Sequence, residues 1–303
     1  MKGDKMFDVV SFGSALIDIF VNTGISEEKG FMYYPLGEKI QIKELRFDIG
    51  GGGTNTAVAF SRLGLKTGYV GKVGDDESGE KVIKMLKKEK IKFLGKIEKG
   101  KITGHSIILD GKGGERTILV YKGVNDEIIM KDIKRFKTKW LYFSSSRGKS
   151  FQTKKELIGI LKKRGVKLAF NPSAYLIKKE NISYLLKMTD ILILNKEEAQ
   201  MLVGKREKDL LKGLNKLGPK IIVITDKNKL ISCYDGNKKY FLKPNKIKVV
   251  ERTGAGDAFS SGFVAGQIAG KSIEYSLRLG LRESESVIQH FGAKNNLIRE
   301  KIK

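Results

Sequence analysis

Short apolar runs alternate with segments of helical periodicity along most of the chain. The apolar runs are typical of strands buried on both faces, and they cover residues 8–14, 66–73, 139–145, 166–172, 190–195 and 220–226. Apolar residues recur at helical spacing in residues 79–89, 153–165, 181–188, 195–204 and 207–218. Strands and helices in this order predict an α/β fold with a mostly parallel sheet covered by helices.

Three segments depart from this alternation and contain hairpin-like turns. Residues 19–47 and 101–122 lack long helical patterns and are richer in β-formers, with turn signals at Asp110-Gly111 and Gly113-Gly114. We expect these two segments to pair as a small separate sheet. Residues 230–244 predict a further hairpin, because Asp235-Gly236 separates two strand-like runs.

Length and composition indicate a globular protein with one large domain or two ordinary ones. The chain has 303 residues, of which 40% are hydrophobic and 9% aromatic, against about 150 residues for a typical domain. Every apolar run is interrupted before the roughly 18 residues that a membrane span needs, so we expect a cytoplasmic protein without membrane contact. The single cysteine, Cys233, and the distant His105 and His290 argue against a disulfide framework and a zinc cluster.

The charge of the chain raises nucleic-acid binding as an alternative. The 59 Lys and Arg residues outnumber the 34 Asp and Glu residues and give a net charge of +25, which attracts any polyanion. However, the lysines are spread along the whole chain and form no basic stripe interleaved with aromatic residues. We therefore expect a solvated, lysine-rich surface, with nucleic-acid binding at most nonspecific.

The strongest chemical signal is a small-residue loop that leads into a helix. Thr253, Gly254, Ala255 and Gly256 precede Asp257, near which a helix is predicted to begin. Without bulky side chains, backbone N–H groups and the helix dipole can hold a phosphate, while Asp257 takes the proton from an attacking hydroxyl. The alternative is that Asp257 only stabilises the start of the helix through the dipole.

A second glycine-rich segment, residues 47–64, has the features of a polyol-binding site. Four consecutive glycines precede Thr54 and Asn55, and the backbone there can approach a hydroxylated ligand. Asn55 offers a donor and an acceptor, and Asp18 can accept hydrogen bonds from two neighbouring hydroxyls. Alternatively, Asn55 is a helix cap and Asp18 a residue at the end of a strand.

Two other phosphate-binding motifs are excluded. The Gly-Lys-Ser tripeptides at 148–150 and 270–272 lack the upstream glycine of a P-loop, since Phe143 and Ala265 stand there. A dinucleotide-binding fingerprint is also incomplete, because Phe259 stands where the last glycine after Gly254 and Gly256 is required.

Together these motifs resemble those of the ribokinase-like, or PfkB, family of carbohydrate and nucleoside kinases, over nearly the full length. The family signature D-T-x-G-A-G-D corresponds to residues 251–257, and Gly-Gly-x-Gly-x-Asn to Gly50, Gly51, Gly53 and Asn55. The family's N-x-x-E motif corresponds to Asn195 and Glu198, directly after a predicted strand. Helix capping is the alternative role for these last two residues.

The resemblance implies a ribokinase-like three-layer α/β/α sandwich with a mostly parallel central sheet and a small β-sheet lid. Residues 1–303 would form a single kinase domain, with lid segments near 19–47 and 101–122 that also offer a homodimer contact. Asp257 would be the catalytic base, with the Gly254-Ala255-Gly256 loop as the anion hole. The acceptor would bind at Asp18, Gly51, Gly53 and Asn55.

The resemblance also implies the cofactors ATP and Mg²⁺. The nucleotide-binding residues would be Asn195, Thr225, Lys227, Thr253, Gly254, Gly256 and Gly292. Magnesium would be held through water by Asn195 and Glu198.

The chain departs from the family pattern at three places. Glu251-Arg252 replaces the usual Asp-Thr, and that Asp commonly contributes to a monovalent-cation site, so activation by potassium is left open. Both glycines of the family's T-x-G-x-x-G nucleotide segment are missing at residues 225–230. Arg282 and Glu283 stand in a region where small residues commonly line the adenine pocket, which leaves the nucleotide preference open.

The function favoured by these observations is the phosphorylation of a sugar hydroxyl. Two alternatives stay within the enzyme class. A nucleoside kinase would use aromatic residues of the lid segments to stack on a base (Phe20, Phe31, Tyr33, Tyr34 and Phe47), and a phosphosugar kinase would use basic ones (Lys39, Lys43, Arg46, Lys101, Arg116 and Lys122). A third, noncatalytic alternative is a sensor that binds a sugar, a nucleotide or nucleic acid.

Overall fold

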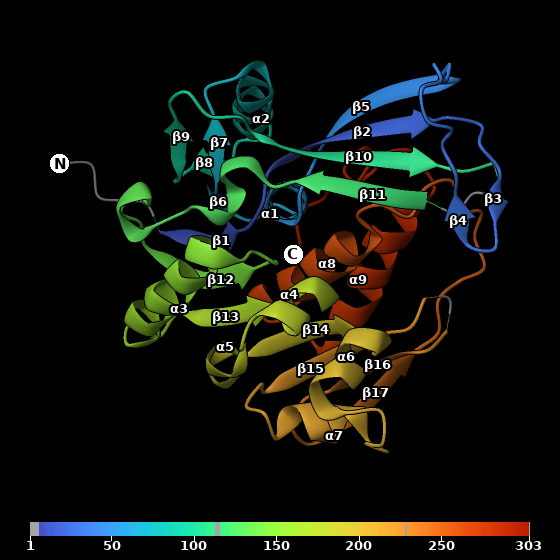
Figure 1. The fold of residues 1–303 in the computed structure, drawn as a ribbon. Helices are drawn as coiled ribbons and strands as arrows, with labels where there is room; N and C mark the ends of the chain where they lie inside the picture. Colours follow the sequence, from blue (N-terminus) through green and yellow to red (C-terminus); the bar gives the residue numbers. More distant parts are fainter. Residues whose placement is uncertain (1–5, 113–115, 228, 303) are drawn as a thin grey trace.

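A nine-stranded sheet forms the centre of the computed structural model, which describes residues 6–112, 116–227 and 229–302 (Figure 1). In spatial order its strands are β17 (Lys239–Leu242), β16 (Ile231–Tyr234), β15 (Ile221–Thr225), β14 (Ile191–Asn195), β13 (Lys167–Phe170), β12 (Thr138–Phe143), β1 (Phe7–Phe12), β6 (Thr67–Val70) and β8 (Lys92–Phe93). Neighbouring strands are parallel from β15 to β8, and the hairpin β16–β17 is antiparallel at one edge.

Helices cover both faces of this sheet. One face carries α3 (Gly148–Lys162), α4 (Ala174–Lys179), α5 (Ser183–Met188), α6 (Lys196–Val203) and α7 (Leu210–Asn215), and the other carries α1 (Gly52–Arg62), α2 (Glu77–Lys88), α8 (Ala255–Ile268) and α9 (Ile273–Ile288). Along β12, Leu141 and Phe143 pack on the first side and Trp140 and Tyr142 on the second. Because both faces are buried, the central strands are continuous apolar runs, as predicted.

A second sheet of four strands forms a separate layer, drawn above α8 and α9 in Figure 1. We call it the small sheet; its strands, in order, are β11 (Arg116–Tyr121), β10 (Gly104–Asp110), β2 (Leu16–Asn22) and β5 (Glu44–Gly50). Asp18 of β2 lies opposite Asp48 of β5 and Ser106 of β10, so these three side chains share one face. That face is turned toward α8, since Arg116 contacts Glu251.

Short elements connect these layers. They are β3 (Glu27–Glu28) paired with β4 (Phe31–Met32), β7 (Lys72–Gly74) paired with β9 (Lys96–Glu98), and the 3₁₀ turns η1 (Gly123–Asp126) and η2 (Met130–Asp132). The predicted hairpin at 230–244 is confirmed, with Asp235 accepting hydrogen bonds from the backbone of Asn237 and Lys238 in its turn. Asp110 is the last residue of β10 and Gly111 follows it, whereas the predicted turn at Gly113-Gly114 lies outside the described residues.

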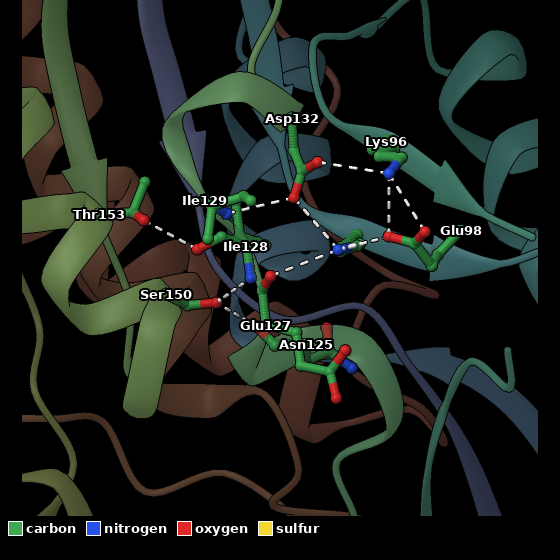
Figure 2. Close-up of polar contacts among 10 residues, drawn as sticks. Lys96, Glu98, Asn125, Glu127, Ile128, Ile129, Asp132, Ser150 and Thr153 are labelled. Carbon is green, nitrogen blue, oxygen red and sulfur yellow. Dashed lines mark hydrogen bonds and ion pairs between the residues drawn. The ribbon is translucent and has the colours of Figure 1, made fainter.

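A polar cluster around the buried Lys72 links β7, β9 and η2. Lys72 donates hydrogen bonds to Asp132 (3.1 Å) and to the carbonyl of Glu127 (3.3 Å), and it also forms an ion pair with Glu98 (2.6 Å). Figure 2 shows Asp132 and Glu98 also facing Lys96, at 3.6 and 3.1 Å. We call this group of side chains the Lys72 cluster. Next to it, Ser150 and Thr153 of α3 bond to the backbone of Ile128, at 2.8 Å each (Figure 2).

Candidate active site

The first turn of α8 is built by small residues. Gly254 adopts a left-handed conformation with φ of 81°, and a Cβ there would lie 2.5 Å from the Cβ of Ala293, so glycine is required. The first N–H group to bond inside the helix is that of Ala258, which donates to the carbonyl of Gly254 (2.8 Å). Within the described part of the chain, the N–H groups of Gly256 and Asp257 have no backbone partner and can hold an anion. The helix begins at Ala255, slightly before the predicted position.

The second glycine-rich segment places the first turn of α1 against the end of β1. Gly53 donates to the carbonyl of Ser14 (3.1 Å), and a Cβ on Gly53 would lie 2.4 Å from the carbonyl carbon of Gly13. Only glycine permits this approach of one backbone to another. Gly51 is the N-terminal cap of α1, and Asn55 therefore lies within the first turn of the helix rather than at its cap.

The two glycine-rich segments meet through one hydrogen bond between side chains. Asn55 donates from Nδ2 to Oδ2 of Asp257 (2.7 Å), although the residues are 202 positions apart. A Cβ on Gly52 would lie 3.3 Å from Oδ1 of Asp257, so the glycine keeps space beside this carboxylate. Burial raises the pKa of Asp257, while the Asn55 hydrogen bond and the charge of Lys294 act to lower it.

Lys294 is a member of this group that the sequence analysis missed. Its side chain is buried, and its Nζ donates to Oδ1 of Asn55 and to the carbonyl of Ile49. Burial lowers the pKa of Lys294 to about 8, against the opposing effects of Asp48, Asp18 and Asp257. The only available signal in the sequence was its position directly after Gly292-Ala293.

Asp18 and Asp48 form a pair of carboxylates on the face of the small sheet nearest α8. Burial raises the pKa of Asp18 to about 6, against the lowering effects of Lys294 and of a hydrogen bond with Ser106. Oδ2 of Asp48 is buried and has no hydrogen-bond partner among the described residues. A Cβ on Gly292 would lie 2.1 Å from this atom, so Gly292 adjoins Asp48. The sequence analysis did not select Asp48.

An aromatic pair borders these carboxylates. Phe20 of β2 meets Phe291 at a ring distance of 4.4 Å, and the Arg46 guanidinium lies 4.6 Å from the Phe291 ring centre. Of the aromatic residues proposed for base stacking, Phe20 is buried, whereas Phe31, Tyr33, Tyr34 and Phe47 are exposed.

A cavity of about 430 Å³ opens beside the first turn of α8. Its apolar lining includes Ile231, Val249, Phe259, Leu281 and Ile288, and its polar lining includes Thr225, Lys227, Lys243, Asn245, Lys246, Ser284 and Glu285, next to Ala255 and Gly256. Of the residues predicted to bind the nucleotide, Thr225, Lys227 and Gly256 therefore line this cavity. Asn195, Thr253, Gly254 and Gly292 are not among the residues that line it.

Arg282 and Glu283, which the sequence placed near the adenine pocket, point elsewhere. Arg282 pairs with Glu300 at 3.1 Å. Glu283 is buried beside Gly262 and accepts a hydrogen bond from the backbone of Ile298 (3.2 Å). Ser284 and Glu285 line the cavity in their place.

Asn195 and Glu198 form a capping box at the start of α6. The Asn195 side chain accepts from the N–H of Glu198 (2.9 Å), and Oε2 of Glu198 accepts from the N–H of Asn195 (2.9 Å). Oε1 of Glu198 accepts from the N–H of Ala174 (3.1 Å). Capping, the alternative role considered for this motif, is thus present. In the described part of the chain no three His, Cys, Asp or Glu side chains form a metal-binding group.

Glu251, which replaces the usual Asp of the signature, is surrounded by donors from the protein. Its Oε1 accepts from the backbone of Arg252 (2.7 Å) and Thr253 (2.8 Å), from the Thr253 hydroxyl (2.8 Å), and from the guanidinium of Arg116. Although burial opposes this shift, the bonds from Thr253 and Arg116 lower the pKa of Glu251. Arg116 thereby connects the small sheet to the loop before α8.

The family model of pfkB carbohydrate kinases matches residues 6–300 of the chain. The chain belongs to the PfkB family. It is therefore an enzyme, a phosphotransferase that acts on a hydroxyl acceptor. Its α/β/α layers and separate small sheet are the ribokinase-like fold that the sequence predicted.

Individual curated proteins and solved structures resemble the chain over most of its length. An uncharacterised sugar kinase of Archaeoglobus fulgidus is 29% identical over 249 residues, which are 80% of this chain and 99% of the relative. Adenosine kinase of Sinorhizobium meliloti matches with a TM-score of 0.81 and 22% identity over 96% of both chains. Arabidopsis thaliana ribokinase, solved with ribose and ATP, matches with a TM-score of 0.80 and 22% identity over 97% of this chain and 96% of its own.

Among the described helices, none combines the length and the apolar composition that crossing a membrane requires.

Proposed function

We propose that this PfkB-family chain transfers the γ-phosphoryl group of ATP to a hydroxyl of a free sugar, with Asp257 as general base. The observation that carries the proposal is the hydrogen bond between Asn55 and Asp257, which joins the two glycine-rich segments at the first turns of α1 and α8. A base between an acceptor site and a helix N-terminus is the arrangement that phosphoryl transfer requires.

In the proposed reaction, the acceptor oxygen attacks the γ-phosphorus while Asp257 removes the hydroxyl proton. As the new P–O bond forms, the bond from the γ-phosphorus to its bridging oxygen breaks, and ADP leaves with that electron pair. The Gly254-Ala255-Gly256 loop acts as the anion hole, since the N–H groups of Gly256 and Asp257 and the dipole of α8 stabilise the charge on the transferred group. The products are a sugar phosphate and ADP, and the proton on Asp257 returns to water.

The base must be ionised to act. Burial raises the pKa of Asp257, and the Asn55 hydrogen bond and the Lys294 charge limit this rise. We therefore expect kcat to fall as the pH is lowered through the pKa of Asp257.

The acceptor is proposed to bind between the small sheet and the first turn of α1. Asp18 and Asp48 supply acceptors for sugar hydroxyls, and Oδ2 of Asp48 has no partner within the described residues. Gly51 and Gly53 keep the α1 backbone close to the ligand, and Asn55 lies beside the base. Asp18→Ala should chiefly raise the KM for the acceptor, whereas Asn55→Ala should also lower kcat, because Asp257 loses its hydrogen-bond donor.

ATP fits the cavity beside α8. The apolar side chains of Ile231, Leu281 and Ile288 suit a base, and the cavity reaches Gly256 at the anion hole. Lys227 and Thr225 lie on the same wall and are proposed to contact the nucleotide. Thr253, Gly254 and Gly292 are assigned to the phosphate end of the nucleotide by the family resemblance alone.

Magnesium fits Asn195 and Glu198 through water. Both carboxylate oxygens of Glu198 already accept backbone hydrogen bonds, which leaves outer contacts to a hydrated ion rather than direct coordination. Bound with ATP, magnesium supplies positive charge that neutralises the phosphates.

The environment of Glu251 does not fit a monovalent-cation site. Four donors from Arg116, Arg252 and Thr253 already share Oε1 of Glu251, and one of them is a guanidinium cation. We propose that activity does not depend on potassium.

The whole of 1–303 is proposed to act as one kinase domain with the small sheet as its lid, formed by segments near 19–47 and 101–122. Closure of the lid would exclude water from the phosphoryl group. By its register, the outer face of the small sheet carries exposed apolar side chains, namely Leu45, Phe47, Ile107, Leu119 and Tyr121. This patch is proposed as a contact between two copies of the chain.

Among the alternatives, a nucleoside acceptor is favoured by the Phe20–Phe291 pair beside Asp18 and Asp48. A phosphosugar is less well supported, because Arg46 is paired with Glu44 and Arg116 with Glu251. A noncatalytic sensor or nucleic-acid binder would leave the Asn55–Asp257 arrangement without a use. Nucleic-acid affinity that disappears at physiological salt would mark nonspecific attraction.

The test is ADP release from MgATP against a panel of free sugars, phosphosugars and nucleosides, with Asp257→Asn as the control. The proposal expects turnover with at least one free sugar, and expects the substitution to abolish it. Turnover with nucleosides alone would replace the sugar by the nucleoside alternative. Nucleotide binding without turnover on any acceptor would favour the sensor.

A further inference from the structure

A chain of three hydrogen-bonded side chains leads from a buried lysine to the proposed base. Lys294, which is 5% exposed, donates to Oδ1 of Asn55, and Nδ2 of Asn55 donates to Asp257 at 2.7 Å. Lys294 is also held by its second bond, to the carbonyl of Ile49 on β5. Each member of the chain comes from a different part of the sequence.

The position of Asn55 between Lys294 and Asp257 fixes the orientation of its side-chain amide. An asparagine side chain accepts at one end and donates at the other, and the two orientations occupy nearly the same space. An ammonium group only donates, so the end of Asn55 that faces Lys294 must be the oxygen. Consequently the end that faces Asp257 must be the N–H₂ group. Reversal of the amide would place two acceptors against each other at the base.

The charges around Lys294 strengthen the effect. Three carboxylates from three elements act on it, namely Asp18 of β2, Asp48 of β5 and Asp257 of α8, while Arg62 of α1 opposes them. Arg62 also donates from Nη1 to the backbone carbonyl of Lys294 (2.5 Å), which fixes the segment. A protonated Lys294 therefore acts to lower the pKa of Asp257, against the burial that raises it.

We propose that Lys294 is a positioning residue of the phosphoryl-transfer site, which fixes the amide of Asn55 so that this amide donates to Asp257. The inference rests on the proposed role of Asp257 as general base. Lys294 acts through Asn55 and through its charge, and it does not itself exchange a proton with the acceptor.

The test compares two substitutions of Lys294 with a matched substitution elsewhere. Lys294→Met removes both the donor and the charge, whereas Lys294→Gln removes the charge and retains a donor for Oδ1 of Asn55. Lys72→Met is the control, because Lys72 is also buried but belongs to the Lys72 cluster. Steady-state kcat and KM are measured between pH 5 and 9 with MgATP and an acceptor phosphorylated by the wild type, taken from D-ribose, D-fructose and adenosine.

Lys294→Met should lower kcat about 10- to 100-fold, because the base loses its fixed partner. The KM for ATP should change by less than about three-fold. The acidic limb of the pH profile should move up by about one pH unit, because the base loses a neighbouring positive charge. Lys294→Gln should have a higher kcat than Lys294→Met, but its acidic limb should be shifted in the same way. Lys72→Met should show the acidic limb of the wild type.

A double-mutant cycle provides the second readout. If Lys294 acts through Asn55, combining Lys294→Met with Asn55→Ala should lower kcat at most about three-fold below Asn55→Ala alone. The proposal would be overturned if the double variant lost kcat by the full product of the two single losses and Lys294→Met left the acidic limb of the pH profile unmoved. The Gln variant is compared in the same cycle, so the test holds if the Met variant folds poorly.

Asp257→Asn in the same series separates the two proposals. If Asp257→Asn keeps wild-type turnover, the role of Asp257 is wrong and the inference about Lys294 falls with it. If Asp257→Asn is inactive while both Lys294 variants keep the wild-type kcat and pH profile, only the inference about Lys294 is overturned.

Discussion

Lys72 and Lys294 are both almost fully buried, yet their surroundings differ in kind. Lys72 lies between the carboxylates of Glu98 (2.6 Å) and Asp132 (3.1 Å), the two acidic residues that Figure 2 shows beside Lys96. Lys294 instead donates to two neutral oxygens, those of Asn55 and of the Ile49 backbone. Burial acts to lower both pKa values. It is outweighed by the carboxylates at Lys72, whose pKa is raised, and it prevails at Lys294, whose pKa falls to about 8.

These surroundings distinguish a lysine that serves the fold from one whose neighbours are free to bind a ligand. In the Lys72 cluster the positive charge meets carboxylates directly, so the group is complete without any other molecule. Around Lys294 the carboxylates of Asp18, Asp48 and Asp257 are close enough to influence its pKa, but none of the ion pairs among the described residues joins one of them to Lys294. Incomplete pairing of buried charges is costly for stability and is typical of sites that bind or react.

The largest expected effect comes from changing the neutral link in the active site. Asn55→Asp would place a second carboxylate against Asp257, where the amide now donates. Like-charge repulsion should raise the pKa of Asp257, and kcat at pH 7 should fall about 10²- to 10³-fold. Steady-state kinetics measure this change, with Asn55→Ala as the control that lacks the added charge. If Asn55→Asp had the same kcat as the wild type, the hydrogen bond from Asn55 to Asp257 would not control the proposed base.

The second effect concerns stability alone. Lys72→Met would leave the buried Asp132 with only the more distant Lys96 as a positive partner, which should cost about 3 kcal/mol of unfolding free energy. The value of kcat should stay within about two-fold of the wild type, because the Lys72 cluster takes no part in the proposed reaction. Urea denaturation and kinetics on the same preparation test this pair of outcomes. A loss of kcat in fully folded protein would show that the two regions are not separate.

A smaller effect is expected in the pH dependence of stability. The pKa of Lys294 is lowered from 10.5 to about 8 by folding, so between these values the unfolded chain binds more protons and stability rises with pH. From pH 8 to 10, the wild type should gain about 2 kcal/mol relative to Lys294→Met. The pKa of Lys72 is raised instead, and its contribution should persist until the pH exceeds 10.5. Urea titrations at several pH values measure the free energy of unfolding. If this free energy changed with pH in the same way in the wild type and in Lys294→Met, the expectation would be contradicted.

The smallest effect is expected from potassium. Because the Arg116 guanidinium already lies against Glu251, replacing potassium by choline should change kcat less than about two-fold. Arg116→Met, which removes that cation, is the informative control and should make turnover more sensitive to the salt used. A wild-type enzyme that loses most of its activity without potassium would show that Glu251 remains available to a cation.

Most of the fold could be predicted from the sequence, because its signals are local. The apolar runs at 190–195 and 220–226 are β14 and β15, and the helical patterns at 79–89 and 153–165 correspond to α2 and α3. Burial on both faces leaves little freedom in the choice of residues, so the pattern is clear. The small sheet was also expected, although β2 begins at Leu16, before the predicted segment.

The site could be predicted only where a motif marks it. Asp257 and Asn55 follow glycine-rich loops, and the structure brings them together. Lys294 and Asp48 carry no such mark, since their importance arises from contacts between distant segments. A sequence does not reveal that a lysine after Gly292-Ala293 points to an amide 239 positions earlier.

The role of Asp257 as the base for phosphoryl transfer to a hydroxyl is tested by following sugar phosphate formation from MgATP by ³¹P NMR in wild type and Asp257→Asn, with ATP affinity measured by titration calorimetry. We predict that the wild type forms a phosphate ester, while Asp257→Asn forms it about 10²- to 10⁴-fold more slowly and binds ATP with nearly the same affinity. Formation of the ester at the wild-type rate by Asp257→Asn would contradict the account.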